Sequence, residues 1–465
     1  MKIAVIGSGI SGLSASYYLS KKFKVDLFEK EDRFGGHSYT LKIIYDQKNK
    51  KHIDVDIGFI VFNEETYPHL ITFFNELGVE YEKSDMSFSV SVENTNIEYC
   101  GRGIKGVFSN RENILNLNFI KMFFEIIRFY NKCEKLDIDK INNITLEEYL
   151  TKEKLSSYFI NYHLIPMVSA IWSMPPKEIK QMPLKFFIIF FKNHGLFKIR
   201  KRPQWFTVTN RSKNYVDKVI NKISGEHYKN YHVNKVVRSK NNVSIYYGDE
   251  SEFFNYDKVI IATHADQALD LIQNPTKDEI KILSNFKYKK NLALIHSDEE
   301  VMPKNKKNWC SWNSSVDDKN LKKSTVTYWL NLLQNLNIDK NIFLTINPSQ
   351  KISEEKIYKK VIFTHPYYDE KTLRNQGLLR LLQNLNIDKN IFLTINPSQK
   401  IPEEKIYKKV IFTHPYYDEE ALRNQGLLRL LQNKENILFC GSYFGYGFHE
   451  DGIKSSLEMI KYIDV

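Results

Sequence analysis

The sequence predicts an α/β protein whose first domain binds a nucleotide on a parallel sheet. Three short apolar runs predict this class, because each has the length of a buried strand: Lys2–Ile6, Lys24–Phe28 and Lys258–Ala262. A glycine motif and a stretch with helical spacing follow the first run, and an acidic residue follows the second. With 465 residues the chain exceeds the usual size of one domain, so we expect a second domain inserted into the first.

The glycine motif is G-x-G-x-x-G, formed by Gly7, Gly9 and Gly12. Gly7 permits the tight turn out of the strand, Gly9 lets the backbone approach a pyrophosphate, and Gly12 lets the next helix pack close to the sheet. That helix, with Ser11 at its start, presents free N–H groups to the phosphates. Glu29 lies 22 positions after Gly7, where its carboxylate can accept hydrogen bonds from ribose hydroxyls. The pattern predicts a Rossmann-type dinucleotide site.

A second stretch, Gly101–Gly106, has the same glycine spacing in a different context. The residues before it, Ile97–Cys100, make a poor buried strand, and Val107–Asn113 make a poor helix start. No strand that ends in an acidic residue follows at the required distance. We therefore expect no nucleotide site here, and with it no separate NAD(P)H site.

The residues after Glu29 indicate which dinucleotide binds. Arg33, the doublet Gly35–Gly36 and His37 follow it closely. This strand-helix-strand-E-x-x-x-R-x-G-G run resembles the FAD-binding segment of the amine oxidase and phytoene desaturase flavoprotein superfamily. The resemblance implies FAD as the cofactor, with the doublet under the pyrophosphate and ribityl chain. It also implies a Rossmann-type FAD-binding domain with an inserted α+β substrate domain.

The resemblance extends along nearly the whole chain, toward bacterial amine-oxidase-like oxidoreductases that are associated with fatty-acid modification. The matching segments are Asp54–Pro68, Tyr162–Pro175, Ile260–Leu269, Trp309–Asn313, Val326–Leu336 and Gly441–Gly452. The resemblance implies that Val236, in the first strand of a hairpin within Lys229–Tyr247, contacts the adenine through its backbone. The alternative for Val236 is a position in an ordinary hairpin.

Two positions depart from the family pattern. Asn210–Ser212 stands where the family has two adjacent glycines. Arginine tolerates the left-handed backbone conformation poorly, so Arg211 argues against a close approach of the backbone in this segment. Ser442 follows Gly441 where the family has an acid that binds the ribityl chain. A serine hydroxyl can make the same contact with a weaker hydrogen bond.

The end of the chain is expected to complete the cofactor site. Apolar spacing predicts a strand over Asn436–Cys440 and a helix over Ile453–Ile463. The resemblance implies that Gly441, Ser442 and Gly452 contact FAD, with Gly452 at the helix N-terminus beside the flavin pyrimidine edge.

Three residues of the same segment are the catalytic candidates. Tyr446 and His449 are expected to line the substrate side of the flavin ring. Glu450 is the third candidate, and its alternative role, shared with Asp451, is to cap the helix or complement its dipole.

A near-identical segment occurs twice in the second half of the chain. Residues 332–384 match residues 381–433 at an offset of 49. A solenoid needs three or more copies, so this architecture is not expected. The fold is expected to have room for one copy only, so the other copy would lie outside that position. The differences are Ser353 against Pro402, Lys371 against Glu420 and Thr372 against Ala421.

The expected domains alternate along the chain. FAD-binding parts are expected over residues 1–65, 205–270 and 434–465. The substrate domain takes residues 66–204, which we expect to be largely helical, and residues 271–433, which contain the duplication.

Composition excludes several classes of protein. The net charge of +12 and pI near 9.1 come from lysines spread along the chain without a basic helix, so no nucleic-acid partner is expected. The four cysteines lie far apart and histidines do not cluster, so we expect neither a disulfide frame nor a metal site. Without a recognisable signal peptide, a reducing cytoplasm is the expected location. The oligomeric state is not readable.

Two apolar stretches suggest the kind of substrate. Leu117–Lys132 has the broad apolar stripe of a helix, and Pro183–Trp205 is apolar in its first half and basic in its second. A tunnel with a cationic mouth would admit an acyl chain, or would let the protein lie on the inner face of an anionic membrane. The alternative is a buried helix with a solvated tail.

The expected function is that of an FAD-dependent oxidoreductase. It would transfer a hydride between a carbon of a lipid or acyl-chain substrate and flavin N5. The enzymatic alternative is a flavin amine oxidase that acts on a small amine. The alternative of a different class is a flavin-binding protein without turnover.

Overall fold

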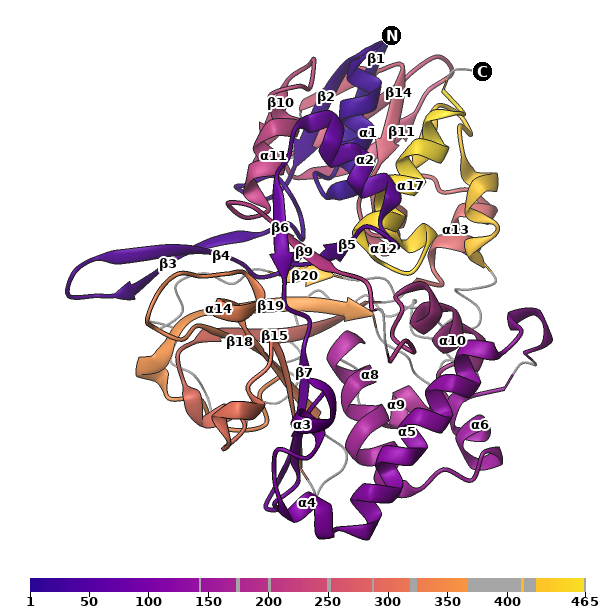
Figure 1. The fold of residues 1–465 in the computed structure, drawn as a ribbon. Helices are drawn as coiled ribbons and strands as arrows, with labels where there is room; N and C mark the ends of the chain where they lie inside the picture. The colour runs from indigo at the N-terminus through magenta and orange to yellow at the C-terminus, as the bar shows by residue number, and fades with distance from the viewer. Residues whose placement is uncertain are drawn as a thin grey trace, which may run out of the picture.

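The structure of the protein is a computed structural model (Figure 1). It describes residues 1–141, 144–172, 176–199, 202–248, 252–286, 288–317, 324–366, 411–413 and 424–463.

A five-stranded parallel sheet forms the nucleotide-binding domain, in the order β10-β2-β1-β14-β21, near the top of Figure 1. Its strands are β1 (Lys2–Ile6), β2 (Lys24–Glu29), β10 (His227–Lys229), β14 (Lys258–Ile261) and β21 (Ile437–Phe439). They come from three separated stretches of the chain. Side chains alternate across the sheet, so Ile3 and Val5 pack into one core and Ala4 and Ile6 into another. All three apolar runs expected as strands are confirmed.

Helices and a small sheet cover the two faces of this parallel sheet. The helices against the face of Ile3 and Val5 are α1 (Ile10–Ser20), α2 (Pro68–Leu77), α11 (Lys213–Ile220) and α17 (His449–Ile460). The other face is covered by β11 (Val233–Arg238), β12 (Val243–Tyr247), β13 (Glu252–Tyr256) and α12 (Ala265–Leu271). The expected hairpin is therefore confirmed. Helix α17 starts four residues earlier than expected, because the tight turn before it ends at Phe448.

The second domain is built on an eight-stranded sheet, in the order β20-β19-β15-β18-β17-β16-β7-β8. Most pairs are antiparallel; β7 with β16 and β19 with β20 are parallel. The strands are β7 (Phe88–Glu93), β8 (Glu98–Cys100), β15 (Tyr288–His296), β16 (Trp312–Asp317), β17 (Ser324–Trp329), β18 (Phe343–Ile346), β19 (Ile357–Pro366) and β20 (Ile411–Thr413).

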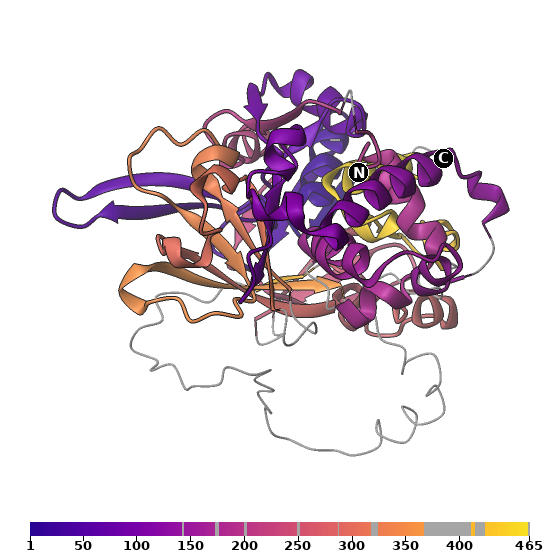
Figure 2. The same ribbon diagram turned by 60° about the horizontal axis from the view of Figure 1, so that its bottom comes forward.

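A layer of helices lies beside this sheet, and Figure 2 shows the two side by side. Its members are α5 (Leu117–Lys135), α6 (Leu146–Lys152), α7 (Ser157–Phe159), α8 (Ile165–Trp172), α9 (Pro176–Gln181) and α10 (Leu184–Asn193). The expected helix over Leu117–Lys132 is confirmed. Helix α10 is buried, so the first half of Pro183–Trp205 follows the buried-helix alternative.

Short strands connect the two domains. The hairpin β3 (Thr40–Asp46) and β4 (Lys51–Asp56) projects from the molecule in Figure 1. The strands β5 (Phe62–Asn63), β6 (Tyr81–Ser84) and β9 (Trp205–Val208) form a small sheet between the domains.

The second glycine motif lies in the second domain, and the prediction that a poor strand and a poor helix start flank it is wrong. Residues Glu98–Cys100 do form a buried strand, β8, and a short helix, α3 (Gly103–Val107), follows it. They form because Cys100 and its neighbours pack at the edge of the eight-stranded sheet. Strand β8 pairs with β7 antiparallel, so the described residues provide no parallel strand–helix–strand unit there.

The first copy of the duplicated segment supplies β18 and β19, and the second copy adds β20. Equivalent residues pair across the parallel strands, as Ile362 does with Ile411. The first copy is anchored by the Ser353 N–H, which donates to Asp298 Oδ2 at 3.2 Å. Most of the second copy, residues 381–410 and 414–423, lies outside the described residues, as do the differing positions Lys371 and Thr372 of the first copy.

Candidate active site

The first glycine motif forms a turn closed by backbone contacts. Gly7 has φ +100° and its N–H donates to the Phe28 carbonyl oxygen at 2.8 Å. A Cβ atom on Gly12 would lie 1.8 Å from the Gly7 carbonyl oxygen, so only glycine allows the helix to start there. A Cβ atom on Gly9 would meet nothing within 4 Å. Gly9 therefore leaves open space at the point where a pyrophosphate would approach.

The glycine doublet packs directly on this turn. A Cβ atom on Gly36 would lie 2.8 Å from the Cα atom of Gly9, and the Gly35 N–H donates to the Ser8 carbonyl oxygen at 3.1 Å. The Arg33 guanidinium lies 3.8 Å from the centre of the Tyr39 ring and donates to the Gly36 carbonyl oxygen at 2.8 Å. The two glycine segments thus form one continuous cradle.

Glu29 lies at the end of β2 beside the same turn, with its side chain mostly buried. Its Oε2 accepts hydrogen bonds from the Ser8 N–H at 3.1 Å and the Ser8 hydroxyl at 2.5 Å, and its Oε1 accepts from the Glu31 N–H at 2.9 Å. A carboxylate has about four acceptor positions, so one remains for a ribose hydroxyl.

Two of the expected cofactor residues have their backbone groups engaged within the protein. The Gly452 N–H donates to the Phe448 carbonyl oxygen at 3.1 Å, because Gly452 is inside α17 and not at its N-terminus as expected. A Cβ atom on Gly452 would lie 2.7 Å from Ile10 Cγ2, so this glycine lets α17 cross α1. Val236 lies in β11, and its carbonyl oxygen accepts from the Gln273 N–H at 3.1 Å.

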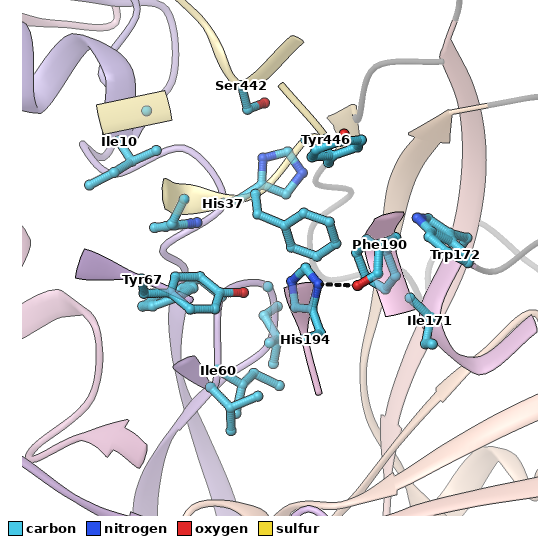
Figure 3. A pocket seen from close by; sticks show the side chains of 18 of the residues that line it. Ile10, His37, Ile60, Tyr67, Ile171, Trp172, Phe190, His194, Ser442 and Tyr446 are labelled. Atoms are coloured by element: carbon cyan, nitrogen blue, oxygen red, sulfur yellow. Dashed lines mark hydrogen bonds between the residues drawn. The ribbon is translucent and has the colours of Figure 1, made fainter. Parts of the chain in front are cut away.

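A cavity of about 320 Å³ joins the nucleotide turn to the second domain (Figure 3). On the nucleotide side it is lined by Gly9, Ser11, His37, Thr263, Gly441 and Ser442. Toward the second domain it is lined by Ile171, Trp172, Phe190, Trp312, Tyr328, Leu344 and Ile346. No Asp, Glu, Lys or Arg is among the described residues that line it.

The catalytic candidates divide between the cavity and the helix ends. Tyr446 and His449 line the cavity. The His449 ring stacks on Phe59 at 3.8 Å between ring centres, and its Nε2 lies 2.9 Å from the Ser38 hydroxyl. The ring of Tyr446 lies 5.6 Å from that of Phe186, and burial raises the pKa of Tyr446.

Glu450 points away from the cavity lining and contacts the start of α2. Its carboxylate accepts the backbone N–H groups of His69 and Leu70, each at 3.0 Å, and also contacts His69 Nδ1. Asp451 accepts the Phe448 N–H at 2.9 Å, and burial raises its pKa to about 7. The acidic pair therefore caps two helices, α2 and α17, which matches the alternative role of capping.

The segment that departs from the family glycines takes the conformation that glycine would favour. Asn210 and Arg211 both have positive φ, +61° and +76°, which contradicts our expectation for the arginine. The strain is offset by hydrogen bonds, because Arg211 Nε donates to the Asp54 carbonyl oxygen at 2.9 Å. The buried Asp56 carboxylate accepts the Ser212 N–H and the Ser212 hydroxyl, each at 2.7 Å.

Several polar residues of the cavity were missed by sequence reasoning, among them Tyr67, His194 and Tyr328. Tyr67 lies in the resembling stretch Asp54–Pro68, and His194 lies in Pro183–Trp205, which was interpreted only by its hydrophobicity. A single histidine after an apolar helix carries no signal of its own, since only the fold brings it to the cavity.

Comparison with known proteins places this geometry in context. Residues 5–77 match the family model described as NAD(P)-binding Rossmann-like domain. Prenylcysteine oxidase 1 of Rattus norvegicus is 30% identical over 198 residues, which cover 36% of this chain and 37% of that protein. The chain thus spans well under half of the length of this curated relative.

Solved structures resemble the whole chain at low sequence identity. Cyclohexylamine oxidase from Brevibacterium oxydans IH-35A has a TM-score of 0.63 at 13% identity, covering 100% of this chain and 99% of that one. The chain has the amine-oxidase-like fold. A CLA-producing fatty acid isomerase from P. acnes shares this amine-oxidase-like fold, with a TM-score of 0.60 at 12% identity over 100% of this chain and 98% of that one.

The nucleotide site of this amine-oxidase-like fold fits FAD. The open space at Gly9, the doublet packed on it and the Glu29 carboxylate suit a dinucleotide, and the cavity continues past His37 toward the second domain. Among the described residues, no cluster of His, Cys, Asp and Glu could hold a metal ion. No described helix is long and apolar enough to cross a membrane.

Proposed function

We propose that this FAD-dependent oxidoreductase transfers a hydride between a carbon of a lipid substrate and flavin N5. The observation that carries the proposal is the cavity lining, which among the described residues has no acidic or basic side chain of Asp, Glu, Lys or Arg. A charged substrate group would be desolvated there without an opposite charge, which is strongly unfavourable. An apolar chain would instead gain free energy from contact with aliphatic and aromatic side chains.

The chemistry at the reacting carbon belongs to the cofactor, since bound FAD supplies the hydride acceptor. The protein binds the nucleotide through the turn at Gly9 and the Glu29 carboxylate. The first turn of α17 presents its positive dipole end to the site, which stabilises negative charge. Phe59, stacked on His449, helps exclude water from the cavity.

The relatives support both a lipid and an amine. The fatty acid isomerase is named for its action on a fatty acid, and the curated relative is a prenylcysteine oxidase. Cyclohexylamine oxidase keeps the amine alternative open. The uncharged lining favours the lipid, because no described lining carboxylate is available to pair with an ammonium group.

Anaerobic reduction of the bound flavin tests the proposal. Long-chain fatty acid esters, long-chain alcohols and prenyl thioethers are expected to bleach the flavin absorbance, and matched amines are not. Bleaching by amines alone would support the amine alternative. Bleaching by none of these compounds would support a flavin-binding protein without turnover.

His449→Ala is expected to slow that reduction about tenfold or more while the flavin stays bound, because loss of the stacked ring admits water and loosens the cavity wall. Stopped-flow absorbance measures the rate. Glu458→Ala, an exposed change on the same helix, is the matched control. An unchanged rate in His449→Ala would remove this histidine from the site.

The proposal includes contact with an anionic membrane at the inner face. Helices α3, α4 (Glu112–Leu115) and the start of α5 lie together at the bottom of Figure 1. They carry five exposed apolar side chains, here called the apolar patch: Ile104, Ile114, Leu115, Leu117 and Phe124. Leu115 and Leu117 are 85% and 80% exposed. Exposed cations flank the patch, namely Lys105, Arg111, Lys121 and Arg128.

Apolar side chains flanked by cations suit an anionic lipid surface, because the apolar side chains insert into the membrane while the cations contact the lipid phosphate groups. The double variant Leu115→Ser, Leu117→Ser is expected to reduce co-sedimentation with phosphatidylglycerol-containing vesicles at least about tenfold. Ile280→Ser, at an exposed position on α13 (Lys277–Leu283), should leave it unchanged. Equal sedimentation of both variants would contradict the contact, as would equal binding to purely zwitterionic vesicles.

A further inference from the structure

Among the residues that line the cavity, His194 has its tautomer fixed by a neighbouring carbonyl group. It follows the last residue of α10, and its Nδ1 lies 2.9 Å from the Phe190 carbonyl oxygen (Figure 3). A carbonyl oxygen can only accept a hydrogen bond, so Nδ1 carries the proton. The other ring nitrogen, Nε2, therefore has a lone pair and acts as an acceptor in a residue that lines the cavity.

Packing holds this imidazole ring in place and keeps it uncharged. It stacks on the Phe190 ring at 4.0 Å with 25° between the planes, and the Phe448 ring lies 5.2 Å away. The side chain is only 9% exposed. Burial lowers the pKa of His194 to about 4, so the ring is neutral at physiological pH.

The ring of Tyr67 lies next to that of His194 at the cavity. The two ring centres are 6.3 Å apart at 80°, and Figure 3 shows the tyrosine hydroxyl directed toward the imidazole. Burial, followed by the nearby charge of Asp451, raises the pKa of Tyr67, so its hydroxyl stays protonated and can donate. The side chain is 4% exposed, and its ring is fixed against Phe62 and Trp205.

We propose that His194 and Tyr67 together bind a hydroxyl group, and that the lipid substrate is an alcohol. The substrate O–H donates to His194 Nε2, and the substrate oxygen accepts from the Tyr67 hydroxyl. This inference rests on the proposed function, since it names the group of the lipid that is oxidised.

A carboxylate, an ether and an ammonium group do not satisfy this pair. A carboxylate would place negative charge against the Nε2 lone pair, and an ether could accept from Tyr67 but could not donate to His194. An ammonium group could donate, but it would be buried without a negative partner, which is strongly unfavourable. Only a group that both donates and accepts uses the two polar atoms at once.

The pair also gives the reaction a base. Bound FAD would supply the acceptor for the hydride, which is the hydrogen and both electrons of the C–H bond that breaks. The substrate O–H bond breaks as its proton moves to His194 Nε2, and the electron pair left on oxygen forms the C=O bond. The alcohol would thus be oxidised to a carbonyl compound, with the two electrons passed to the bound cofactor and one proton held on His194.

Binding to the chemically reduced holoprotein tests the recognition without turnover. Isothermal titration with octan-1-ol, 1-methoxyoctane, octylamine and octanoate compares four head groups on one chain. Octan-1-ol is expected to bind at least about tenfold more tightly than the methyl ether, a difference of about 1.4 kcal/mol. Equal affinity for the alcohol and the ether would overturn the proposal.

Variants then assign the preference to the two side chains. His194→Phe is expected to remove most of the preference for the alcohol and leave the affinity for the ether unchanged. Tyr67→Phe is expected to weaken binding of both the alcohol and the ether, because each accepts a hydrogen bond from the Tyr67 hydroxyl. His194→Gln keeps an acceptor that is not a base, so it should retain binding but slow flavin reduction by octan-1-ol at least about a hundredfold. An alcohol preference that persists in His194→Phe, or unchanged affinity for both compounds in Tyr67→Phe, would refute the assignment.

Flavin content and melting temperature check that each variant folds, and Tyr67→Phe removes only one oxygen atom. The alcohol assignment can be refuted without refuting the proposed function. Reduction of the wild-type flavin by lipid esters, without any preference for alcohols, would overturn the pair and leave lipid oxidation standing. Failure of every lipid to reduce the flavin would overturn the proposed function itself.

Discussion

Replacing Gly9 with alanine is expected to abolish FAD binding while changing the free energy of unfolding of the apoprotein by no more than about 1 kcal/mol. The backbone at Gly9 has φ −64°, which alanine adopts without strain, and the new methyl group would meet no protein atom within 4 Å. It would occupy the space through which a pyrophosphate approaches the turn. Absorbance of the purified protein measures the flavin, and urea denaturation of the apoprotein measures stability.

Gly12→Ala is the matched comparison, three residues along the same motif. Its methyl group would lie 1.8 Å from the Gly7 carbonyl oxygen, so the turn must deform. We expect it to lose flavin and also at least about 2 kcal/mol of stability. The two variants separate contact with the cofactor from packing of the turn. Normal flavin content in Gly9→Ala would contradict the placement of the pyrophosphate.

Asp56→Ala is expected to lower the free energy of unfolding by about 3–5 kcal/mol. The buried carboxylate accepts the Ser212 N–H and hydroxyl and the Thr40 hydroxyl, at 2.7, 2.7 and 2.6 Å. Its removal leaves these donors buried without an acceptor, next to the left-handed Arg211. Urea denaturation of the apoprotein measures the loss. Asp54→Ala, exposed on the same strand, should change stability by less than about 0.5 kcal/mol.

The pH dependence of this effect has a definite sign. Burial raises the pKa of Asp56 from 3.8 to about 6. Between these values the folded protein holds a proton that the unfolded chain releases, so this group makes stability fall as pH rises from about 4 to about 6. Asp56→Asn has no such titration, and its hydroxyl neighbours can turn to accept from the amide. A stability slope equal to that of wild type in the asparagine variant would contradict the assignment.

Much of the nucleotide site could be predicted because its signals are local. The motif at Gly7, the doublet after Arg33 and the acid at Glu29 lie within one short stretch, where strand length and glycine conformation decide the structure. The contacts of Glu450 and His194 could not be predicted in the same way. Glu450 bonds to the Leu70 N–H, 380 positions earlier, and no local pattern records which helix N-terminus a carboxylate will meet.

Local propensity also failed where tertiary packing decided the backbone. Arg211 adopts a positive φ because Asp54 and Asp56 supply hydrogen bonds that hold the segment. Helix α17 begins at His449, earlier than its apolar spacing indicates, because Asp451 caps the Phe448 N–H. The domain boundaries and the catalytic roles of Tyr446, His449 and Glu450 stay predictions.

Because the duplicated segment occurs twice, either of two nearly identical stretches could supply the strands β18 and β19 of the second domain. The two copies have the same residues along β18 and β19. The backbone N–H at Ser353 is a point where they differ, because it donates a hydrogen bond to Asp298. Pro402, its counterpart, has no N–H to donate to Asp298. A hydrogen bond to a charged acceptor is worth about 1.5–3 kcal/mol, which favours the first copy roughly ten- to a hundredfold. The hydrogen bond donated by the Ser353 N–H thus favours the first copy of the duplicated segment over the second at this position of the sheet.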